Sequence, residues 1–175
     1  MNAYAPVTKH CLSACDETGN WELKTIELPH IRECTMTDAD QGEHLAREFF
    51  RRVWAPPHDL TAIDELMTPD YRITTAGQVV ESREAFKSWV AEMQKLVAGA
   101  TNEHLEIITN AVGDRVVSRW ITRGRNNGMF GLPADQKLVE FTGIAIWRVE
   151  SGRLAECWVE RSAFELYYRL RDSGD

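Results

Sequence analysis

Apolar residues recur every three or four positions in three stretches of the first hundred residues, a spacing that predicts amphipathic helices. The first stretch spans 38–55, between N-capping oxygens and two prolines that interrupt helices. The second spans 60–68. The third lies between Ser82, whose hydroxyl can cap a helix, and Gly99. The pattern therefore predicts three helices in this part of the chain.

Alternation of apolar and polar residues dominates after the third helix and predicts strands. One strand is already expected at 70–75, and the later alternating segments are 104–112, 114–125, 137–150 and 153–162. Residues 163–170 return to helical spacing and predict a short closing helix. Helices followed by a run of hairpin strands favour an α+β fold with a mostly antiparallel sheet and its helices on one face.

Residues 1–37 show no clear period, apart from a short extended segment at 21–28, and we interpret them as a partly irregular N-terminal extension. Residues 38–175 are predicted to form the main domain. The extension holds Cys11, Cys15 and Cys34, whose spacing differs from that of a zinc ribbon. Free thiols are the favoured interpretation, and a metal site that also uses His10 or His30 is the alternative.

Composition narrows the class of protein. The 175 residues are 43% hydrophobic and 27% charged, which excludes long-range disorder and allows one domain with a sizeable core. The net charge of −7 provides no basic surface for nucleic acid or for an anionic membrane. No apolar run reaches the length of a membrane span, and the first residues do not resemble a secretory signal, so we expect a cytoplasmic protein.

Three local strings point to a known family. They are FFRRVWAPPHDLTAIDELMTPDYRI, DRVVSRWITRGRNNGMFGLPADQKLVEFTG and IWRVESGRLAECW, and the matching region covers residues 43–170. In this order and spacing they resemble the SnoaL-like polyketide cyclases of the NTF2-like superfamily. The resemblance implies a cone in which a bent sheet packs on the N-terminal helices around a deep apolar pocket. It also implies a homodimer through the outer face of the sheet, where Trp158 is expected.

The same resemblance allows the family's chemistry to be examined position by position. In the family's aldol-type cyclases, a pocket Asp on the last strand removes a proton from an acidic carbon. That position holds Val159 here, and the His two residues before it is replaced by Cys157. Two further polar positions of the family fall on Ala145 and Ile73, and a loop His is replaced by Asn126. The usual proton abstraction is therefore not expected in this chain.

Strand parity indicates which polar residues remain near such a pocket. Cys157, Val159 and Arg161 share one face of their strand, whereas Trp158 and Glu160 point to the other face. Glu160 is therefore expected to be a solvated or interface charge. The predicted substrate-binding residues are Tyr71, Ile73, Trp120, Asn126, Ala145, Trp147, Cys157, Val159 and Arg161.

Three of these residues are also candidate catalytic groups. Arg161 can hold an enolate or carboxylate oxygen, or it can pair with Glu165. Asn126 can donate to a carbonyl, or it can cap a turn. Tyr71 can donate a hydrogen bond at the pocket floor, or it can pack with its hydroxyl toward solvent.

The preferred functional hypothesis is a cyclase or isomerase that acts on a hydrophobic polyketide-like or polycyclic molecule without a cofactor or metal. A non-catalytic small-molecule binding module of the same fold is the alternative. An epoxide-hydrolase-like enzyme is the third hypothesis, although its Asp-Arg-Asp network cannot be assembled from the late strands. The fold alone does not decide among these functions.

Overall fold

The computed structural model describes residues 9–15, 21–26 and 37–172, and it divides into the units Met1–Thr35 and Met36–Asp175. In the first unit, β1 (Lys9–Cys15) and β2 (Trp21–Ile26) pair as an antiparallel hairpin. Of these, only the second strand was expected from the sequence. Cys34 and His30 lie outside the described residues, as do the side chains of the other residues proposed for a metal site.

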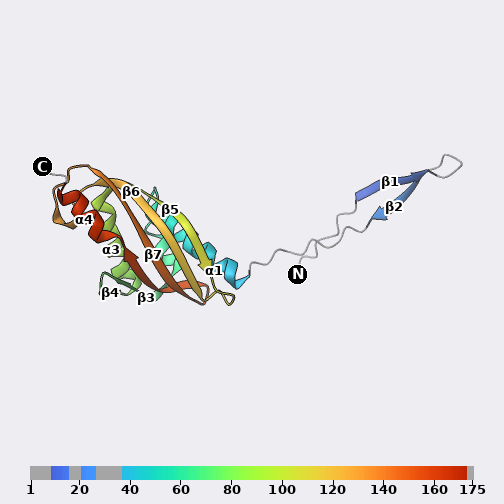
Figure 1. Ribbon diagram of the computed structural model, residues 1–175. Coiled ribbons are helices and arrows are strands. Elements are labelled where there is room, and N and C mark those ends of the chain that lie inside the picture. The colour runs from blue at the N-terminus through green and yellow to red at the C-terminus, as the bar shows by residue number, and fades with distance from the viewer. Residues whose placement is uncertain (1–8, 16–20, 27–36, 173–175) are drawn as a thin grey trace. The chain divides into compact units, whose positions relative to one another are not determined.

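A six-stranded curved sheet forms the centre of the second unit (Figure 1). Its strands, in spatial order, are β4 (Gln78–Glu81), β3 (Met67–Thr75), β8 (Arg153–Arg161), β7 (Leu138–Glu150), β6 (Arg115–Asn126) and β5 (Val97–Thr109). Strands β5 to β8 form an antiparallel meander, whereas β3 runs parallel to β8. The predicted α+β class is confirmed.

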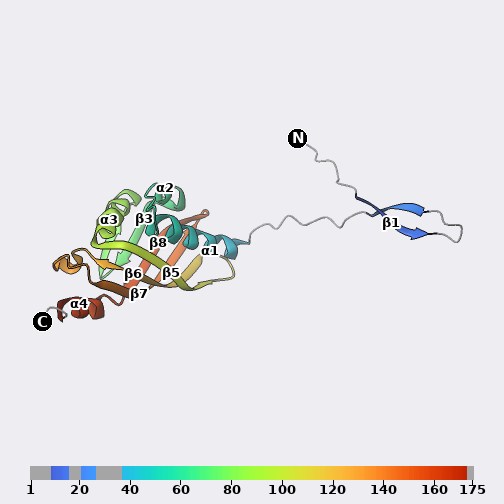
Figure 2. The same ribbon diagram turned by 90° about the horizontal axis from the view of Figure 1, so that it is seen from above.

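Helices α1, α2 and α3 lie on one side of the sheet, as Figure 2 shows. The helical elements are α1 (Asp38–Phe49), the π-helical turn η1 (Phe50–Trp54), α2 (Ala62–Leu66), α3 (Arg83–Leu96), the 3-10 turn η2 (Met129–Gly131) and α4 (Ala163–Asp172). A capping box between Thr37 and Asp40 starts α1. None of the helices in the described ranges is long and apolar enough to cross a membrane.

Strands β3, β4 and β5 differ most from the sequence prediction. Strand β5 begins at Val97 instead of residue 104, because Gly99 adopts φ +62° inside the strand and bends it. Strand β3 begins at Met67, three residues before the predicted start. The short strand β4 was not predicted, since four residues after a tight turn carry too little alternating pattern.

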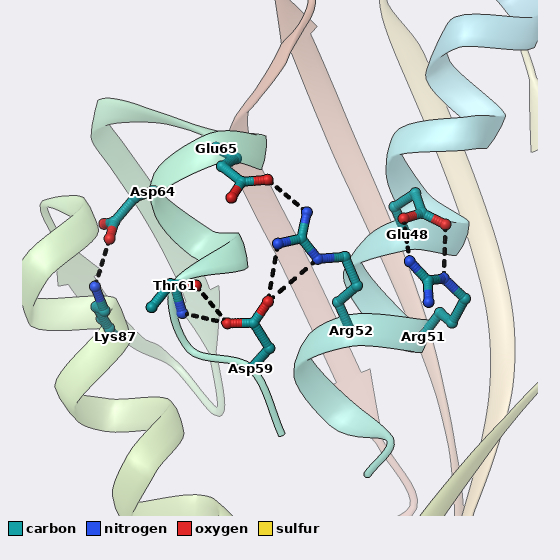
Figure 3. A network of polar contacts seen from close by, with 8 residues as sticks. All are labelled: Glu48, Arg51, Arg52, Asp59, Thr61, Asp64, Glu65 and Lys87. Atoms are coloured by element: carbon teal, nitrogen blue, oxygen red, sulfur yellow. Dashed lines mark hydrogen bonds and ion pairs between the residues drawn. The ribbon is translucent and has the colours of Figure 1, made fainter. Parts of the chain in front are cut away.

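A network of charged side chains fixes the helices to one another on the side away from the sheet (Figure 3). Arg52 of η1 donates to Asp59 (Nη2 to Oδ2, 2.8 Å) and to Glu65 of α2 (Nη1 to Oε2, 2.5 Å). Lys87 of α3 pairs with Asp64 of α2 at 2.6 Å. These contacts link η1 to α2 and α2 to α3.

Aromatic side chains fill the interior between the helices and the sheet. The ring centre of Phe49 lies 5.6 Å from that of Phe50, 6.2 Å from that of Phe86 and 6.2 Å from that of Trp147. These rings belong to α1, η1, α3 and β7, so a single cluster joins the helices to the sheet. These rings do not fill the interior completely, and a cavity remains between the helices and the sheet.

Candidate ligand cavity

The cavity between the helices and the inner face of the sheet has a volume of about 440 Å³. This volume lies within the range of about 300–1,000 Å³ that is typical of small-molecule sites. Eight of the nine predicted site residues line it, namely Tyr71, Ile73, Trp120, Ala145, Trp147, Cys157, Val159 and Arg161. Its lining is mainly aromatic and aliphatic, so it suits a hydrophobic molecule.

Strand β8 forms one side of the cavity and presents alternate residues to it. Cys157, Val159 and Arg161 line the cavity, and each intervening residue points outward. Glu160 is exposed and Trp158 is 38% exposed on the outer face. The Glu160 carboxylate is thus directed away from the cavity, as strand parity predicted.

The three positions where the resemblance predicts that acid–base groups are replaced lie together in the cavity. Val159 pairs with Ala145 across β7 and β8, and Ile73 of β3 is the register partner of Cys157. All three side chains are apolar and almost fully buried. The residues described as lining the cavity include no Asp, Glu, His or Lys. The lining described here thus offers no carboxylate or imidazole.

Tyr71, Trp147 and Cys157 form the closed end of the cavity, where each residue is at most 1% exposed. Burial raises the pKa of the Tyr71 hydroxyl well above its usual value, and Cys157 raises it further. Burial also raises the pKa of the Cys157 thiol, although Tyr71 and Arg161 act in the opposite direction. Both groups therefore stay neutral near pH 7.

Two polar atoms at this closed end have no hydrogen-bond partner within the described chain: the Tyr71 hydroxyl and the Trp147 indole nitrogen. Tyr71 lies close enough to Cys157 and Trp147 for them to affect its pKa, yet no hydrogen bond of regular geometry satisfies its hydroxyl. Both atoms have almost no accessible surface, so they are sealed by the surrounding side chains and do not face the open part of the cavity.

Arg161 is the one charged residue among the side chains that line the cavity. Its Nη1 donates to Thr75 Oγ1 at 2.5 Å. Its Cζ lies 5.7 Å from the ring centre of Trp89 and 5.9 Å from that of Trp120. Burial lowers the pKa of this guanidinium, although an arginine remains protonated near neutral pH. No ion pair joins it to Glu165 or to another carboxylate in residues 37–172.

Asn126, the ninth predicted residue, does not line the cavity. Its Nδ2 donates to Pro133 O and to Asp135 Oδ1, both at 2.8 Å, and its Oδ1 accepts from Gly128 N and Met129 N. The side chain is therefore fully used inside the loop between β6 and β7. It holds the segment that presents Met129 and Phe130 to the cavity opening.

Three features were not anticipated from the sequence. Thr75 and Trp89 both contact Arg161. Trp89 lies in the third predicted helix, but nothing in the sequence indicated a role for Thr75. His104 is half-buried, and its ring centre lies 4.4 Å from that of Phe50. Burial lowers the pKa of this imidazole, and neither ring nitrogen has a partner within residues 37–172.

No group of three or more His, Cys, Asp or Glu side chains in the described part of the chain is arranged to hold a metal ion. The cavity instead combines an apolar lining with one cation that contacts two indoles. Such an arrangement can bind and orient an oxygen-bearing hydrophobic molecule.

Comparison with known proteins identifies the fold. A solved structure from Jannaschia sp. CCS1, assigned to the SnoaL-like polyketide cyclases, superposes with a TM-score of 0.72 at 18% identity, covering 78% of this chain and 95% of that chain. A polyketide-cyclase-like protein from Acidithiobacillus ferrooxidans gives 0.70 at 19% identity, with 79% and 100% covered.

An epoxide hydrolase of the LEH-like type from M. tuberculosis gives a TM-score of 0.62 at 13% identity, with 78% of this chain and 89% of that chain covered. No curated protein matches the chain in sequence. The model of one sequence family matches residues 44–167, most of the chain. The chain therefore belongs to the SnoaL-like polyketide cyclase family.

Proposed function

We propose that this protein encloses a hydrophobic polyketide-like or polycyclic molecule and catalyses its cyclisation or isomerisation. The observation that carries the proposal is the apolar cavity of about 440 Å³ with polar groups at only a few points. Most of the ligand's surface would be removed from water, while Arg161 fixes its orientation. Membership of the SnoaL-like family supports a reaction of this class.

Catalysis in such a site rests on confinement of the substrate. A flexible chain that is held in a folded conformer loses much of the entropic barrier to ring closure, an effect that reaches several kcal/mol, roughly 7–11, in well-oriented reactions. Because the lining has no carboxylate, the substrate must be a carbon acid that loses its proton to water without a protein base. The carbon of the resulting enolate then attacks a carbonyl carbon of the same molecule, and the new alkoxide takes a proton from water.

A binding module without catalysis is the second candidate, and one observation favours it. Ile73, Ala145 and Val159 are apolar, and the lining has no carboxylate or imidazole. A pure carrier does not require such acid–base groups. Epoxide hydrolysis is less well supported, although a related fold is found in the M. tuberculosis enzyme. That chemistry activates a water with carboxylates, and the lining offers none.

The decisive experiment blocks the cavity. In Ala145→Phe a ring would enter the cavity from β7, whereas the matched control Ile144→Phe places the same ring on the outer face, where Ile144 is 48% exposed. Both variants and the unmodified protein are incubated with a linear poly-β-carbonyl compound, and the products are followed by mass spectrometry. Cyclised product that disappears only in Ala145→Phe supports the proposal.

Two other results would change the conclusion. Binding of the probe by the unmodified protein without any product would favour the binding module. If neither binding nor product depended on Ala145, the cavity would not be the functional site.

We also propose that the outer face of the sheet forms a homodimer. Trp158, Ile146, Val117 and Ile108 are register partners in one row across β8, β7, β6 and β5. In this row on the outer face, Ile108 is 56% exposed, Ile146 is 41% exposed and Trp158 is 38% exposed. Because a contiguous exposed apolar row is unusual on a monomer, a second copy of this sheet is its natural partner.

A further inference from the structure

The surroundings of Arg161 depend on a glycine in the neighbouring strand. Trp120, Gly143 and Arg161 are register partners in one row across β6, β7 and β8. A Cβ on Gly143 would come within 2.2 Å of the Trp120 ring. The missing side chain therefore lets the indole of β6 lie across β7, where it reaches the guanidinium of β8.

The guanidinium keeps most of its hydrogen-bonding capacity unused. An arginine has five N–H donors, and within the described chain Arg161 makes one hydrogen bond, to Thr75. Its other nitrogens are not among the polar atoms sealed from solvent. Since Arg161 lines the cavity, these donors are available to a molecule inside it.

Other arginines on the same sheet differ in this respect. Arg72 and Arg148 both pair with Glu156, and Arg123 pairs with Glu103 and Glu140. Arg161 is partly buried, and a cation removed from water without a counter-charge is costly, so its retention calls for a compensating partner. The indoles of Trp89 and Trp120 provide a part of that compensation, but they are neutral.

We propose that the ligand of this cavity carries an anionic oxygen, either a carboxylate or a stabilised enolate, which binds Arg161 between Trp89 and Trp120. This inference rests on the proposed function and specifies its substrate class. Gln78 is exposed and Phe130 is 43% exposed, so both mark the open end, whereas Tyr71 is fully buried. The anionic end of the ligand contacts Arg161, and its apolar body extends toward the aromatic rings of the closed end.

Two matched pairs of probes test this inference by isothermal titration calorimetry at pH 7.5. The carboxylate pair is 2-naphthoate and neutral 2-naphthamide. The enolate pair is 2-hydroxy-1,4-naphthoquinone, ionised at this pH, and neutral 2-methoxy-1,4-naphthoquinone. The unmodified protein is expected to bind at least one anion about tenfold or more tightly than its neutral partner, because hydrogen bonds to charged groups are the strong ones.

Substitution of the cation should remove that preference. In Arg161→Met the ratio of anion to neutral affinity is expected to fall to about one, while the neutral probes still bind. Arg119→Met is the matched control, because Arg119 is exposed on the outer face and should leave the ratio unchanged. Thr75→Val, which removes the hydrogen bond to Nη1, is expected to reduce the ratio only partly.

The outcomes separate the two proposals. A preference for naphthoate identifies a carboxylate ligand, and a preference for the hydroxyquinone identifies an enolate. Equal affinity for the anions and their neutral partners in the unmodified protein overturns the inference but leaves a hydrophobic-ligand cavity intact. Failure of all four probes to bind overturns the proposed function as well.

Discussion

The two faces of strand β8 distribute charge in opposite ways. On the outer face, Glu156 accepts hydrogen bonds from Arg72 (2.6 Å) and Arg148 (3.3 Å), and Glu160 is exposed to solvent. On the inner face, Arg161 lies in an apolar cavity and no carboxylate pairs with it in residues 37–172. Strand β8 thus carries a carboxylate paired with two arginines on its outer face and an arginine without a carboxylate partner on its inner face.

Stability of the fold therefore does not explain the charge on the inner face. Two guanidiniums compensate the charge of Glu156, whereas Arg161 has one hydroxyl and two aromatic rings around it. Proteins that violate a rule of charge pairing in a cavity usually do so at a functional site. The inner face is therefore the place where a ligand completes the electrostatics.

The strongest way to break this contrast is to place a carboxylate on the inner face with Val159→Asp. Positions 159 and 161 lie on the same face about 6.6 Å apart along the strand, so the new carboxylate can pair with Arg161. We expect affinity for the anionic naphthalene probe to fall about 100-fold, because the guanidinium is neutralised before the ligand arrives. Isothermal titration calorimetry measures the change.

The isosteric variant Val159→Asn is the control for size and polarity. It should lose much less affinity than the Asp variant, and thermal unfolding of both variants checks that they are folded. Equal losses in Asp and Asn would mean that a free charge on Arg161 does not matter for binding.

Much of the fold could be predicted from the sequence because the pattern is strong where elements are long. The alternating run gave the four strands β5 to β8, and the helical stripe gave α3. The edge strands were harder, since β4 has only four residues and Gly99 resembles a helix stop although it bends a strand. Local pattern cannot distinguish these two uses of glycine.

The site was partly predictable for a different reason. Strand parity separates Cys157 and Arg161 from Trp158 and Glu160, and this information is contained in the spacing alone. The hydrogen bond from Arg161 to Thr75 joins residues 86 positions apart and has no local signal. The role of Asn126 could not be decided from the sequence either, because the side-chain amide of a loop Asn can bind a ligand or form hydrogen bonds within its own loop.

The outer face can be disrupted by Trp158→Glu. A charge in the centre of an apolar interface is desolvated without a partner, so we expect the proposed dimer to weaken by about 30-fold. Light scattering of the unmodified protein should give twice the 20.0 kDa chain mass, and the variant should approach the single-chain mass. A mass near 20.0 kDa for the unmodified protein at working concentration would rule out the dimer.

Removal of the outer carboxylate by Glu156→Gln should cost about 1–1.5 kcal/mol of folding stability at pH 7, because its two arginine partners are partly exposed. Burial tends to raise the pKa of Glu156, but Arg72 and Arg148 outweigh it and the pKa is lowered overall.

A lowered folded pKa means that this stabilisation is present above the unfolded value and is lost as the pH falls through the folded value. The difference in denaturation midpoint between the unmodified protein and the variant should thus shrink below pH 4.5, the ordinary value for Glu. A difference that stayed constant into acid would show that the carboxylate charge is not involved.

The smallest expected effect concerns Asp59, which belongs to the charged network of the helices (Figure 3) and lies outside the carboxylate-free cavity. Hydrogen bonds from Thr61, followed by those from Arg52, lower the pKa of Asp59 from 3.8 to about 2. Its stabilising contribution is therefore present above pH 3.8 and is lost as the pH falls toward 2.

Thr61→Val removes the hydroxyl donor at 2.5 Å but keeps the backbone donor. We expect the pKa of Asp59, followed by NMR titration, to rise toward 3.8, while Asp135, held by Asn126, keeps its lowered pKa. A wild-type Asp59 that titrated at 3.8 would show that its donors do not hold it ionised.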